Sequence, residues 1–221
     1  MGIGDDNQMK ILAHRGYWNQ KIEKNTPLAL RTALEHGYGF ESDVRDYAGR
    51  MVISHNIATA NSQDAEEVFK WLYDFGDNFC FAINIKADGL KDILKSYLTK
   101  YSITNYFLFD MSVPQMVEFR EMELRYFTRQ SEVESNPVMY EDAAGVWIDG
   151  FWSTDWITKE LLDEHIRNGK EVCLVSPDLH GKENYKEFWQ KLVDDKIELC
   201  KVILCTDHPD EAKEFFNEKE N

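Results

Sequence analysis

The chain has 221 residues, of which 40 are acidic and 25 are basic, so its formal net charge is -15. Hydrophobic residues make up 43% of it and aromatic residues 13%, a composition that predicts a folded core and excludes a disordered chain. The length fits a single domain over residues 1–221. The acidic excess excludes a general nucleic-acid binder and adsorption to anionic membranes, because both need clustered Lys and Arg. An anionic ligand would therefore need a local source of positive charge.

Eight short apolar runs, each bounded by turn residues, are predicted as strands. Several of them are apolar on both faces, which is typical of buried parallel strands. The runs cover residues 10–16, 39–45, 78–87, 105–112, 124–131, 145–151, 170–178 and 200–207.

Amphipathic stretches between these runs are predicted as helices. Thr26 and Pro27 give a cap and a first turn to one of them, and Asp64 is a candidate cap for the next. The stretches cover residues 26–37, 64–76, 90–101, 157–169 and 185–193, and a last helix follows Pro209.

The strand–helix alternation predicts a parallel α/β fold. Eight units fit a closed (β/α)8 TIM-type barrel, and 221 residues leave it lean, without an inserted subdomain. An open doubly wound sheet is the alternative. It gains no support as a dinucleotide fold, because no glycine-rich phosphate loop follows the first strand.

Polar side chains gather where the predicted strands end, and in a barrel those carboxyl ends form the active-site face. Glu41 and Asp43 are two residues apart, so both point to the same side of their strand. Asn84 and Lys86 have the same spacing. The full set is His14, Arg15, Glu41, Asp43, His55, Asn84, Lys86, Asp110 and Asp149.

This set of residue types predicts phosphate chemistry. Two neighbouring carboxylates repel each other unless a cation or a proton intervenes, and oxygen ligands suit Mg²⁺ or Ca²⁺. A divalent cation together with Arg15 and Lys86 would supply the positive charge that an anionic substrate needs. His14 and His55 could then act as general base and general acid.

The motifs from His14 to Asn56 resemble those of the glycerophosphodiester phosphodiesterase family. The family's H-R-G, E-N-T, E-x-D and H-D motifs correspond to residues 14–16, 24–26, 41–43 and 55–56. Its E-x-K motif corresponds to residues 84–86, and its T-D-x-P motif to residues 206–209.

The resemblance implies a phosphodiester hydrolase on a barrel of the phospholipase-C type, with a place in lipid metabolism. It implies one divalent cation, Mg²⁺ or Ca²⁺ with Mn²⁺ as an alternative, and a small organic phosphodiester as substrate. It assigns acid/base catalysis to His14 and His55, phosphate binding to Arg15 and Lys86, and cation binding to Glu41, Asp43 and Asn84.

Three departures from the family pattern bear on this reading. Lys24 stands where the family has glutamate, although Glu23 is adjacent. Asn84 replaces a carboxylate ligand, which lowers the expected cation affinity unless Asp110 or Asp149 compensates. Residues 56–77 are too few for the family's inserted subdomain, so we expect an open pocket.

Two other functions stay open at this point. One is a degenerate relative that binds a phosphorylated ligand without turnover, a reading that Asn84 favours. The other is a phospholipase-type lyase that forms a cyclic phosphate. The chain has no basic or strongly apolar surface segment, so we expect no stable membrane association.

The remaining residues carry weaker predictions. Residues 176–181 are interpreted as a loop, with Asp178 or His180 as alternative contacts to a leaving group. The cysteines Cys80, Cys173, Cys200 and Cys205 are predicted to be free thiols buried in strands. The first ten residues lack the charged and apolar pattern of a secretion signal, so a cytoplasmic location is expected.

Overall fold

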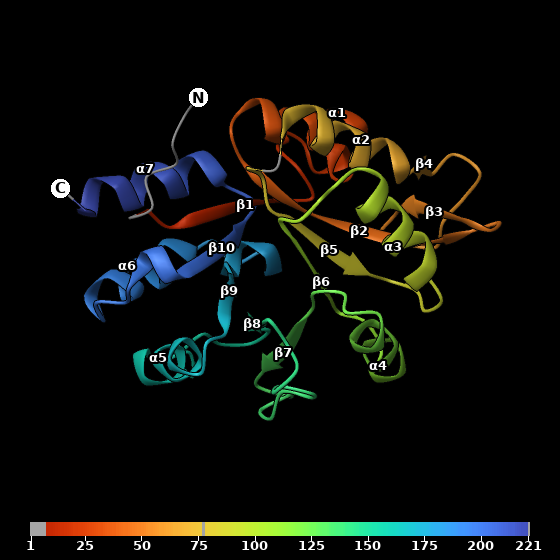
Figure 1. Cartoon of the computed structure of the whole chain (residues 1–221). Helices are drawn as coiled ribbons and strands as arrows, with labels where there is room; N and C mark the ends of the chain where they lie inside the picture. The colour runs from red at the N-terminus through yellow and green to blue at the C-terminus, as the bar shows by residue number, and fades with distance from the viewer. Residues whose placement is uncertain (1–7, 77, 221) are drawn as a thin grey trace. The chain divides into compact units, whose positions relative to one another are not determined.

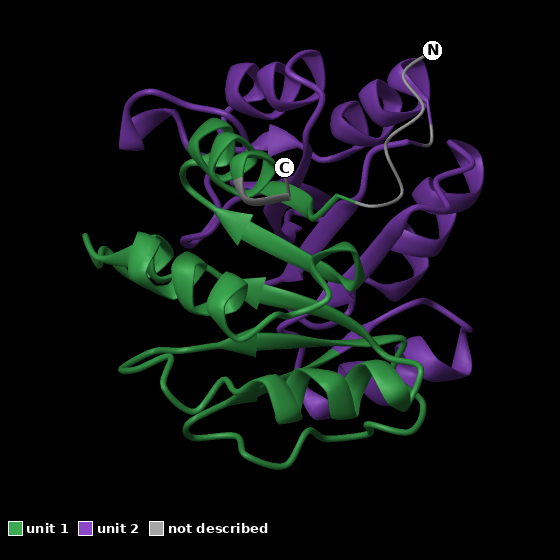
Figure 2. Ribbon diagram, turned by 90° about the vertical axis from the view of Figure 1, so that its left-hand side faces the viewer, with its two compact units in different colours: residues 1–12, 128–221 green, residues 13–127 purple. Residues whose placement is uncertain are grey.

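The structure is a computed structural model that describes residues 8–76 and 78–220. Contacts within the chain divide it into two compact units (Figure 2): unit 1 comprises residues 1–12 and 128–221, and unit 2 comprises residues 13–127. Residues 1–7, on which part of the expectation about a secretion signal rests, lie outside the described residues. A single domain over residues 1–221 stays a prediction.

Each of the eight predicted runs contains a strand. These strands are β1 (Lys10–His14), β2 (Gly39–Tyr47), β5 (Phe81–Ile85), β6 (Tyr106–Phe109), β7 (Phe127–Ser131), β8 (Gly145–Asp149), β9 (Glu171–Val175) and β10 (Val202–Thr206). Two further short strands are β3 (Arg50–Ile53) and β4 (Gln63–Asp64).

Helices follow most of these strands. They are α1 (Pro27–Glu35), α2 (Glu66–Phe75), α3 (Lys91–Lys100), α4 (Val113–Glu121), α5 (Lys159–Arg167), α6 (Tyr185–Asp194) and α7 (Pro209–Glu220). The predicted cap at Thr26 is confirmed, since its side chain accepts a hydrogen bond from the Ala29 amide at 3.2 Å. Asp64 acts just before α2, where its carboxylate accepts from the Glu66 amide at 3.0 Å.

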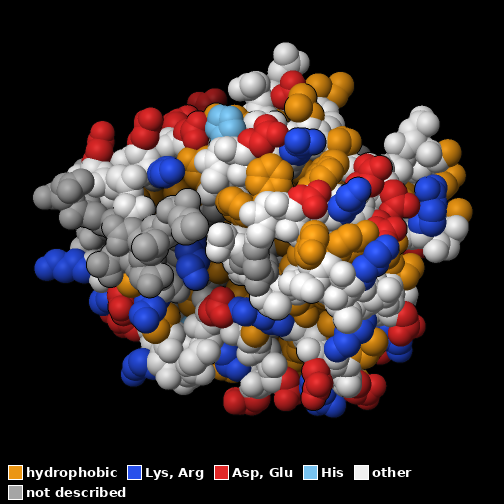
Figure 3. Space-filling model, turned by 45° about the horizontal axis from the view of Figure 1, so that its top comes forward, with side chains coloured by type: hydrophobic (Ala, Val, Ile, Leu, Met, Phe, Trp, Pro, Cys, Tyr) orange, Lys and Arg blue, Asp and Glu red, His pale blue; other side chains and the backbone are white. Residues whose placement is uncertain are grey.

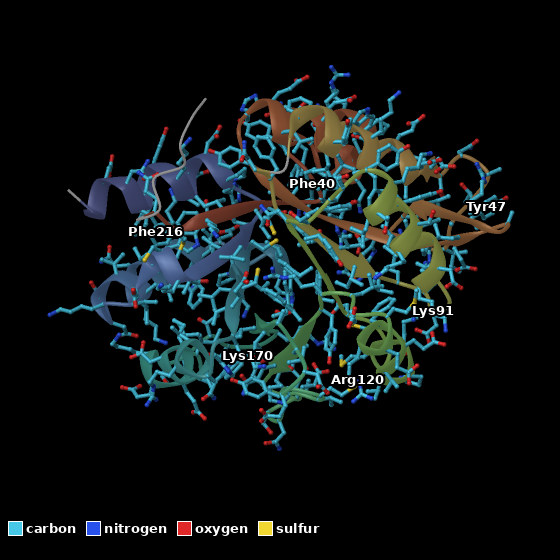
Figure 4. The ribbon with its side chains drawn as sticks, in the orientation of Figure 1. Phe40, Tyr47, Lys91, Arg120, Lys170 and Phe216 are labelled. Carbon is cyan, nitrogen blue, oxygen red and sulfur yellow. The ribbon has the colours of Figure 1, made fainter. Side chains whose placement is uncertain are left out.

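Unit 2 is built on parallel strands β2, β5 and β6 (Figure 1). α1 packs on β2, and α2 lies against α1 and α3. Phe40 on β2, labelled in Figure 4, is buried with its ring 4.9 Å from that of Phe81, and Phe69 of α2 lies 5.5 Å from Phe81. Each such buried aromatic stabilises the fold by about 1.5–3 kcal/mol relative to an exposed one.

Unit 1 is built on parallel strands β8, β9 and β10, with β7 beside β8. α5 packs on β9. The core centres on Trp189 of α6, which is fully buried and whose indole donates a hydrogen bond to the Ser176 hydroxyl at 2.9 Å. Phe216 of α7, labelled in Figure 4, packs its ring 5.9 Å from that of Trp189.

The structure differs from the sequence prediction in the helix that follows β6. The sequence patterns do not predict α4, although Ser112 caps it and accepts a hydrogen bond from the Gln115 amide at 3.2 Å. A Pro in the first turn completes a recognisable start signal, but the apolar spacing along α4 is too weak to mark it.

After β7 the expected strand–helix unit is incomplete. Residues 132–144, all described, contain no helix, and none of the predicted helices falls there, so the unit that begins with β7 has a strand without a helix. The short strand β3 turns back on β2 as an antiparallel hairpin. Ala48 and Gly49 form its two-residue turn with positive φ angles of 48° and 78°, a geometry that matches strand twist.

The prediction that the cysteines are buried in strands is confirmed for two of the four. Cys173 and Cys205 are buried in strands, but Cys80 and Cys200 lie outside strands and are half-buried. On the face drawn in Figure 3, acidic and basic side chains are interspersed. Among the described residues, no helix combines the length and the apolar character that a membrane span requires.

Candidate active site

Glu41 and Asp43 lie on β2 and are almost fully buried. The parallel register of β2 and β5 pairs Asp43 with Asn84, which is also buried. Because alternate residues of a strand share a face, the two carboxylates and the amide face the same side of unit 2. The side-chain amide of Asn84 favours the charged form of Glu41, and so opposes the rise in the pKa of that carboxyl.

The loop after β1 brings a cation to this place. Arg15 has a φ of 58°, and its amide donates to the Glu41 carbonyl at 2.9 Å, so the loop is fastened to β2. Its Nε lies 3.0 Å from Asp43 Oδ2 but does not form a hydrogen bond, so the contact is electrostatic. Gly16 follows with a φ of 91°, beside the backbone of α1.

Lys86, the first residue after β5, adds a second cation. Its Nζ lies 3.4 Å from Asp43 Oδ1 and 3.5 Å from Asp110 Oδ2. Its amide donates to the Val44 carbonyl at 2.9 Å, which fixes the end of β5 against β2. The structure therefore brings together five of the predicted site residues, which we call the strand-end cluster: Arg15, Glu41, Asp43, Asn84 and Lys86.

Asn25 is a member of the site that the sequence reasoning did not single out. Its Nδ2 donates to Asp43 Oδ2 at 2.8 Å, and its Oδ1 accepts from the Ser42 hydroxyl at 2.7 Å. Its φ of 61° is in the left-handed region, which Asn tolerates better than most residues. The signal was present, because Asn25 is the central residue of the motif at 24–26.

The electrostatics of the strand-end cluster make Glu41 an unusual carboxyl. Burial, and then the neighbouring charge of Asp43, raise the pKa of Glu41 to about 8, against the opposing influence of Arg15 and Lys86. His14 Nε2 lies 3.9 Å from Glu41 Oε2, which places this buried histidine at the edge of the cluster.

His55 occupies a different setting from His14. The Ser54 amide donates to the Asp43 carbonyl at 3.0 Å, so the backbone that leads to His55 runs beside Asp43. The His55 side chain itself is exposed, and its Nδ1 lies 3.2 Å from Asn56 Oδ1. Among the described residues it makes no hydrogen bond or ion pair with the strand-end cluster.

The oxygen atoms of the cluster fit a hard divalent cation. Asp43 Oδ1 and Asn84 Oδ1 are buried acceptors without a hydrogen-bond partner, and the carboxyl of Glu41 lies beside Asn84. Carboxylate and amide oxygens are ligands that Mg²⁺ and Ca²⁺ accept. Across residues 8–76 and 78–220, no group of three or more His, Cys, Asp and Glu side chains is placed to hold a metal ion.

The substituted motif at 24–26 is not repaired by its neighbour. Glu23 accepts hydrogen bonds from the amides of Asn19 and Gln20 at 2.9 and 3.1 Å. It thus caps the short 3₁₀ helix Lys21–Glu23, of which it is the last residue. Lys24 places its ammonium 4.4 Å from the centre of the Trp18 ring.

Asp149 and the residues of 176–181 belong to unit 1. His180 Nε2 lies 2.6 Å from Asp149 Oδ1. The buried Asp178 accepts from the Thr206 hydroxyl at 3.0 Å and from the Asp207 amide at 2.6 Å. The segment is thus mostly a short 3₁₀ helix (Pro177–His180) rather than a loop, and Asp178 joins the ends of β9 and β10.

The chain was compared with protein-family models, curated proteins and solved structures. No protein-family model matches the sequence, and no curated protein does. A glycerophosphodiester phosphodiesterase from Parabacteroides distasonis aligns with a TM-score of 0.67 at 15% identity, over 99% of this chain and 100% of its own. A glycerophosphoryl diester phosphodiesterase from the same organism gives 0.69 at 13% identity, over 97% and 88%.

A third solved structure, a glycerophosphodiester phosphodiesterase from Agrobacterium tumefaciens, aligns with a TM-score of 0.62 at 15% identity over 92% of this chain and 98% of its own. These similarities establish the fold, which is an α/β barrel, and the prediction of a TIM-type barrel is confirmed. The resemblance to the family that the motifs indicated is confirmed at the level of the fold.

Proposed function

We propose that this chain, which has the fold of solved glycerophosphodiester phosphodiesterases, is a phosphodiester hydrolase that acts on a small organic phosphodiester. One observation carries the proposal. Two cationic side chains, Arg15 and Lys86, lie beside the buried carboxylates of β2. They provide local positive charge in a chain whose net charge of -15 would otherwise repel a phosphate.

Arg15 and Lys86 would bind the phosphate oxygens. Both side chains now neutralise Asp43, at 3.0 and 3.4 Å, so their charges are held in place before any substrate arrives. Such preorganised cations stabilise the negative charge that develops on phosphoryl oxygens in the transition state, because they need no rearrangement during the reaction.

Glu41, Asp43 and Asn84 would hold a divalent cation, Mg²⁺ or Ca²⁺ with Mn²⁺ as an alternative. When bound, such a cation supplies Lewis-acid polarisation of a phosphoryl oxygen and a fixed orientation for the diester. The buried acceptors Asp43 Oδ1 and Asn84 Oδ1 support this assignment, since each lacks a hydrogen-bond partner.

His14 and His55 would move the protons. His14 is buried beside Glu41, a setting that restrains its ring, and we assign it the role nearer the phosphate. The exposed His55 would exchange a proton with the group on the open side of the site. A positioned acid or base of this kind contributes about 10²–10⁴-fold to a rate.

The length of the segment after His55 bears on the range of substrates. Of residues 56–77, the described residues 56–76 form only the elements β4 and α2, so this segment contributes no inserted subdomain. A site without such a subdomain would suit glycerophosphodiester-like compounds of varied leaving group, and thus a role in lipid metabolism. A cytoplasmic location, no nucleic-acid partner and no stable membrane association remain predictions.

Turnover of bis(p-nitrophenyl) phosphate and of glycerophosphodiesters tests the proposal. We expect activity with Mg²⁺, Mn²⁺ or Ca²⁺ and none in EDTA. His14→Gln and His55→Gln should each lose about 10²-fold or more. His36→Gln is the matched control, because His36 is exposed at the end of α1 and packs on Tyr17. Equal activity of all three variants would contradict the assignment.

A second function has one observation in its favour. The register partner of Asp43 is the uncharged amide of Asn84, where the family motif has a carboxylate, and both cations of the strand-end cluster are paired with Asp43. Such a site could bind a phosphorylated ligand without turnover. Phosphate binding together with no diesterase activity under any cation would support it. A cyclic phosphate product, detected by ³¹P NMR, would instead indicate a lyase.

A further inference from the structure

Lys86 is held between two carboxylates of very different burial. Its Nζ lies 3.4 Å from Oδ1 of the fully buried Asp43 and 3.5 Å from Oδ2 of Asp110, whose side chain is 16% exposed. At nearly equal distances, the ammonium is shared between a side chain of the strand-end cluster and one outside it.

Asp110 lies where the cluster lacks a charge. β6 runs parallel to β5, and Phe109 is the register partner of Asn84. Asp110 is the next residue, so it lies just after the end of β6, the strand adjacent to the one that carries the uncharged amide. Its φ of 64° ends β6 in the left-handed region, which Asp and Asn adopt more readily than other side chains.

The two contacts of Lys86 conflict when a cation is bound. Asp43 Oδ1 is a buried acceptor without a hydrogen bond, so it is one of the oxygens that a divalent cation would use. An ammonium so close to that oxygen would then face a dication, and like charges repel. The Lys86 ammonium must then lose its ion pair with Asp43 but stay close enough to bind phosphate. Asp110 provides a carboxylate that this ammonium already contacts.

We propose that Asp110 is a positioning residue that retains the Lys86 ammonium when a divalent cation occupies Asp43, and that it thereby sets the cation affinity of the strand-end cluster. The inference rests on the proposed function in one respect, namely that Glu41, Asp43 and Asn84 bind a divalent cation. Asp110 acts through Lys86 and is not itself a ligand.

Mn²⁺ binding to the full chain, measured by isothermal titration calorimetry, tests this without any assay of activity. Asp110→Asn keeps the shape of the side chain and its tolerance of a positive φ, but removes the charge. Partners that orient a metal site commonly contribute 10–100-fold to affinity, so we expect Mn²⁺ to bind about 10-fold more weakly. Asp110→Glu, which keeps the charge, should recover most of the loss.

Asp88→Asn is the matched control. Asp88 is exposed, lies near the same end of β5 and accepts a hydrogen bond from the Ser112 hydroxyl at 2.7 Å. It has no ion pair with Lys86 among the described residues. Its loss of charge should leave Mn²⁺ affinity within about 2-fold of the wild type if long-range electrostatics are screened.

A double-mutant cycle separates positioning from direct ligation. In a Lys86→Met background the ammonium is gone, so adding Asp110→Asn should change Mn²⁺ affinity by less than about 2-fold. If Asp110 were a ligand, the loss would be equal in both backgrounds, and the inference would be wrong.

Two other results would also overturn the inference and would identify what failed. Wild-type affinity in Asp110→Asn would refute the positioning role and leave the proposed cation site intact. No binding of Mn²⁺ to the wild type would refute the cation site itself, and the positioning role with it. Thermal unfolding of each variant in EDTA shows whether the fold is retained.

Discussion

Gly16→Ala tests how tightly the loop after β1 is fitted against α1. A Cβ at residue 16 would lie 2.5 Å from the carbonyl carbon of Ala29, and 2.7 Å from both the Ala29 oxygen and the Leu30 nitrogen. Ordinary contacts of a Cβ begin at 3.4 Å, and the obstructing atoms are backbone, which no side-chain rotation can relieve. The φ of 91° adds strain of its own.

The expected cost follows from these two contributions. An alanine forced into the left-handed region costs about 1–2 kcal/mol. Overpacking that displaces backbone costs about 1–3 kcal/mol more, so Gly16→Ala should lower the free energy of unfolding by about 2–5 kcal/mol. Gly37→Ala is the matched control, because Gly37 follows the other end of α1 with a φ of 84°, and a Cβ added there would have nothing within 4 Å. It should cost only about 1–2 kcal/mol.

Urea unfolding followed by tryptophan fluorescence measures both variants. Mn²⁺ affinity provides a second measurement, since the same loop positions Arg15 through its hydrogen bond to the Glu41 carbonyl at 2.9 Å. We expect Gly16→Ala to weaken Mn²⁺ binding and Gly37→Ala to leave it unchanged. If the two variants unfold within about 0.5 kcal/mol of each other, the clash with α1 does not control this loop, and the reasoning fails.

Three further predictions concern single side chains. Asn84→Asp should bind Mn²⁺ about 10-fold more tightly by calorimetry, since ligand charge sets affinity. In EDTA it should melt at a lower temperature than wild type, because the new carboxylate is the register partner of Asp43 and like charges repel. Weaker Mn²⁺ binding would count against residue 84 as a ligand. Burial lowers the pKa of His165, so the histidine binds a proton more readily in the unfolded chain, and the free energy of unfolding should fall as the pH drops below 6.5. His165→Gln should reduce the difference in unfolding free energy between pH 7.5 and pH 5.5. An unchanged difference would contradict this. Trp189→Phe leaves the buried Ser176 hydroxyl without its indole partner and should lower the unfolding free energy by about 1–3 kcal/mol in urea, with no loss counting against that bond.

The motifs of the sequence account for much of the candidate site because they are local. The spacing of Glu41 and Asp43 puts them on one face of any strand, and a polar residue at a strand end is visible in a linear pattern. The linear pattern predicts that the five residues of the strand-end cluster meet at the strand ends, and the structure brings them together.

Other features of the site depend on contacts that no linear pattern carries. Asn25 reaches Asp43 only because its backbone adopts a positive φ next to the loop after β1. Compensation for Asn84 by Asp149 stays a prediction; within unit 1, the Asp149 carboxylate lies 2.6 Å from His180 Nε2. The sequence gives Asp110 no definite role, and its contact with Lys86 depends on the register between β5 and β6.

The sequence by itself determined the strands of the eight predicted runs and most of the helices, because hydrophobic spacing and capping residues act within a few positions of the chain. It also determined the chemistry available to the site. The tertiary structure alone decided which charges meet: that Lys86 stands between Asp43 and Asp110, and that burial beside Asp43 raises the pKa of Glu41 to about 8. Desolvation and ion pairing depend on atoms brought close by strand register, and those distances are not contained in the spacing of residues along the chain.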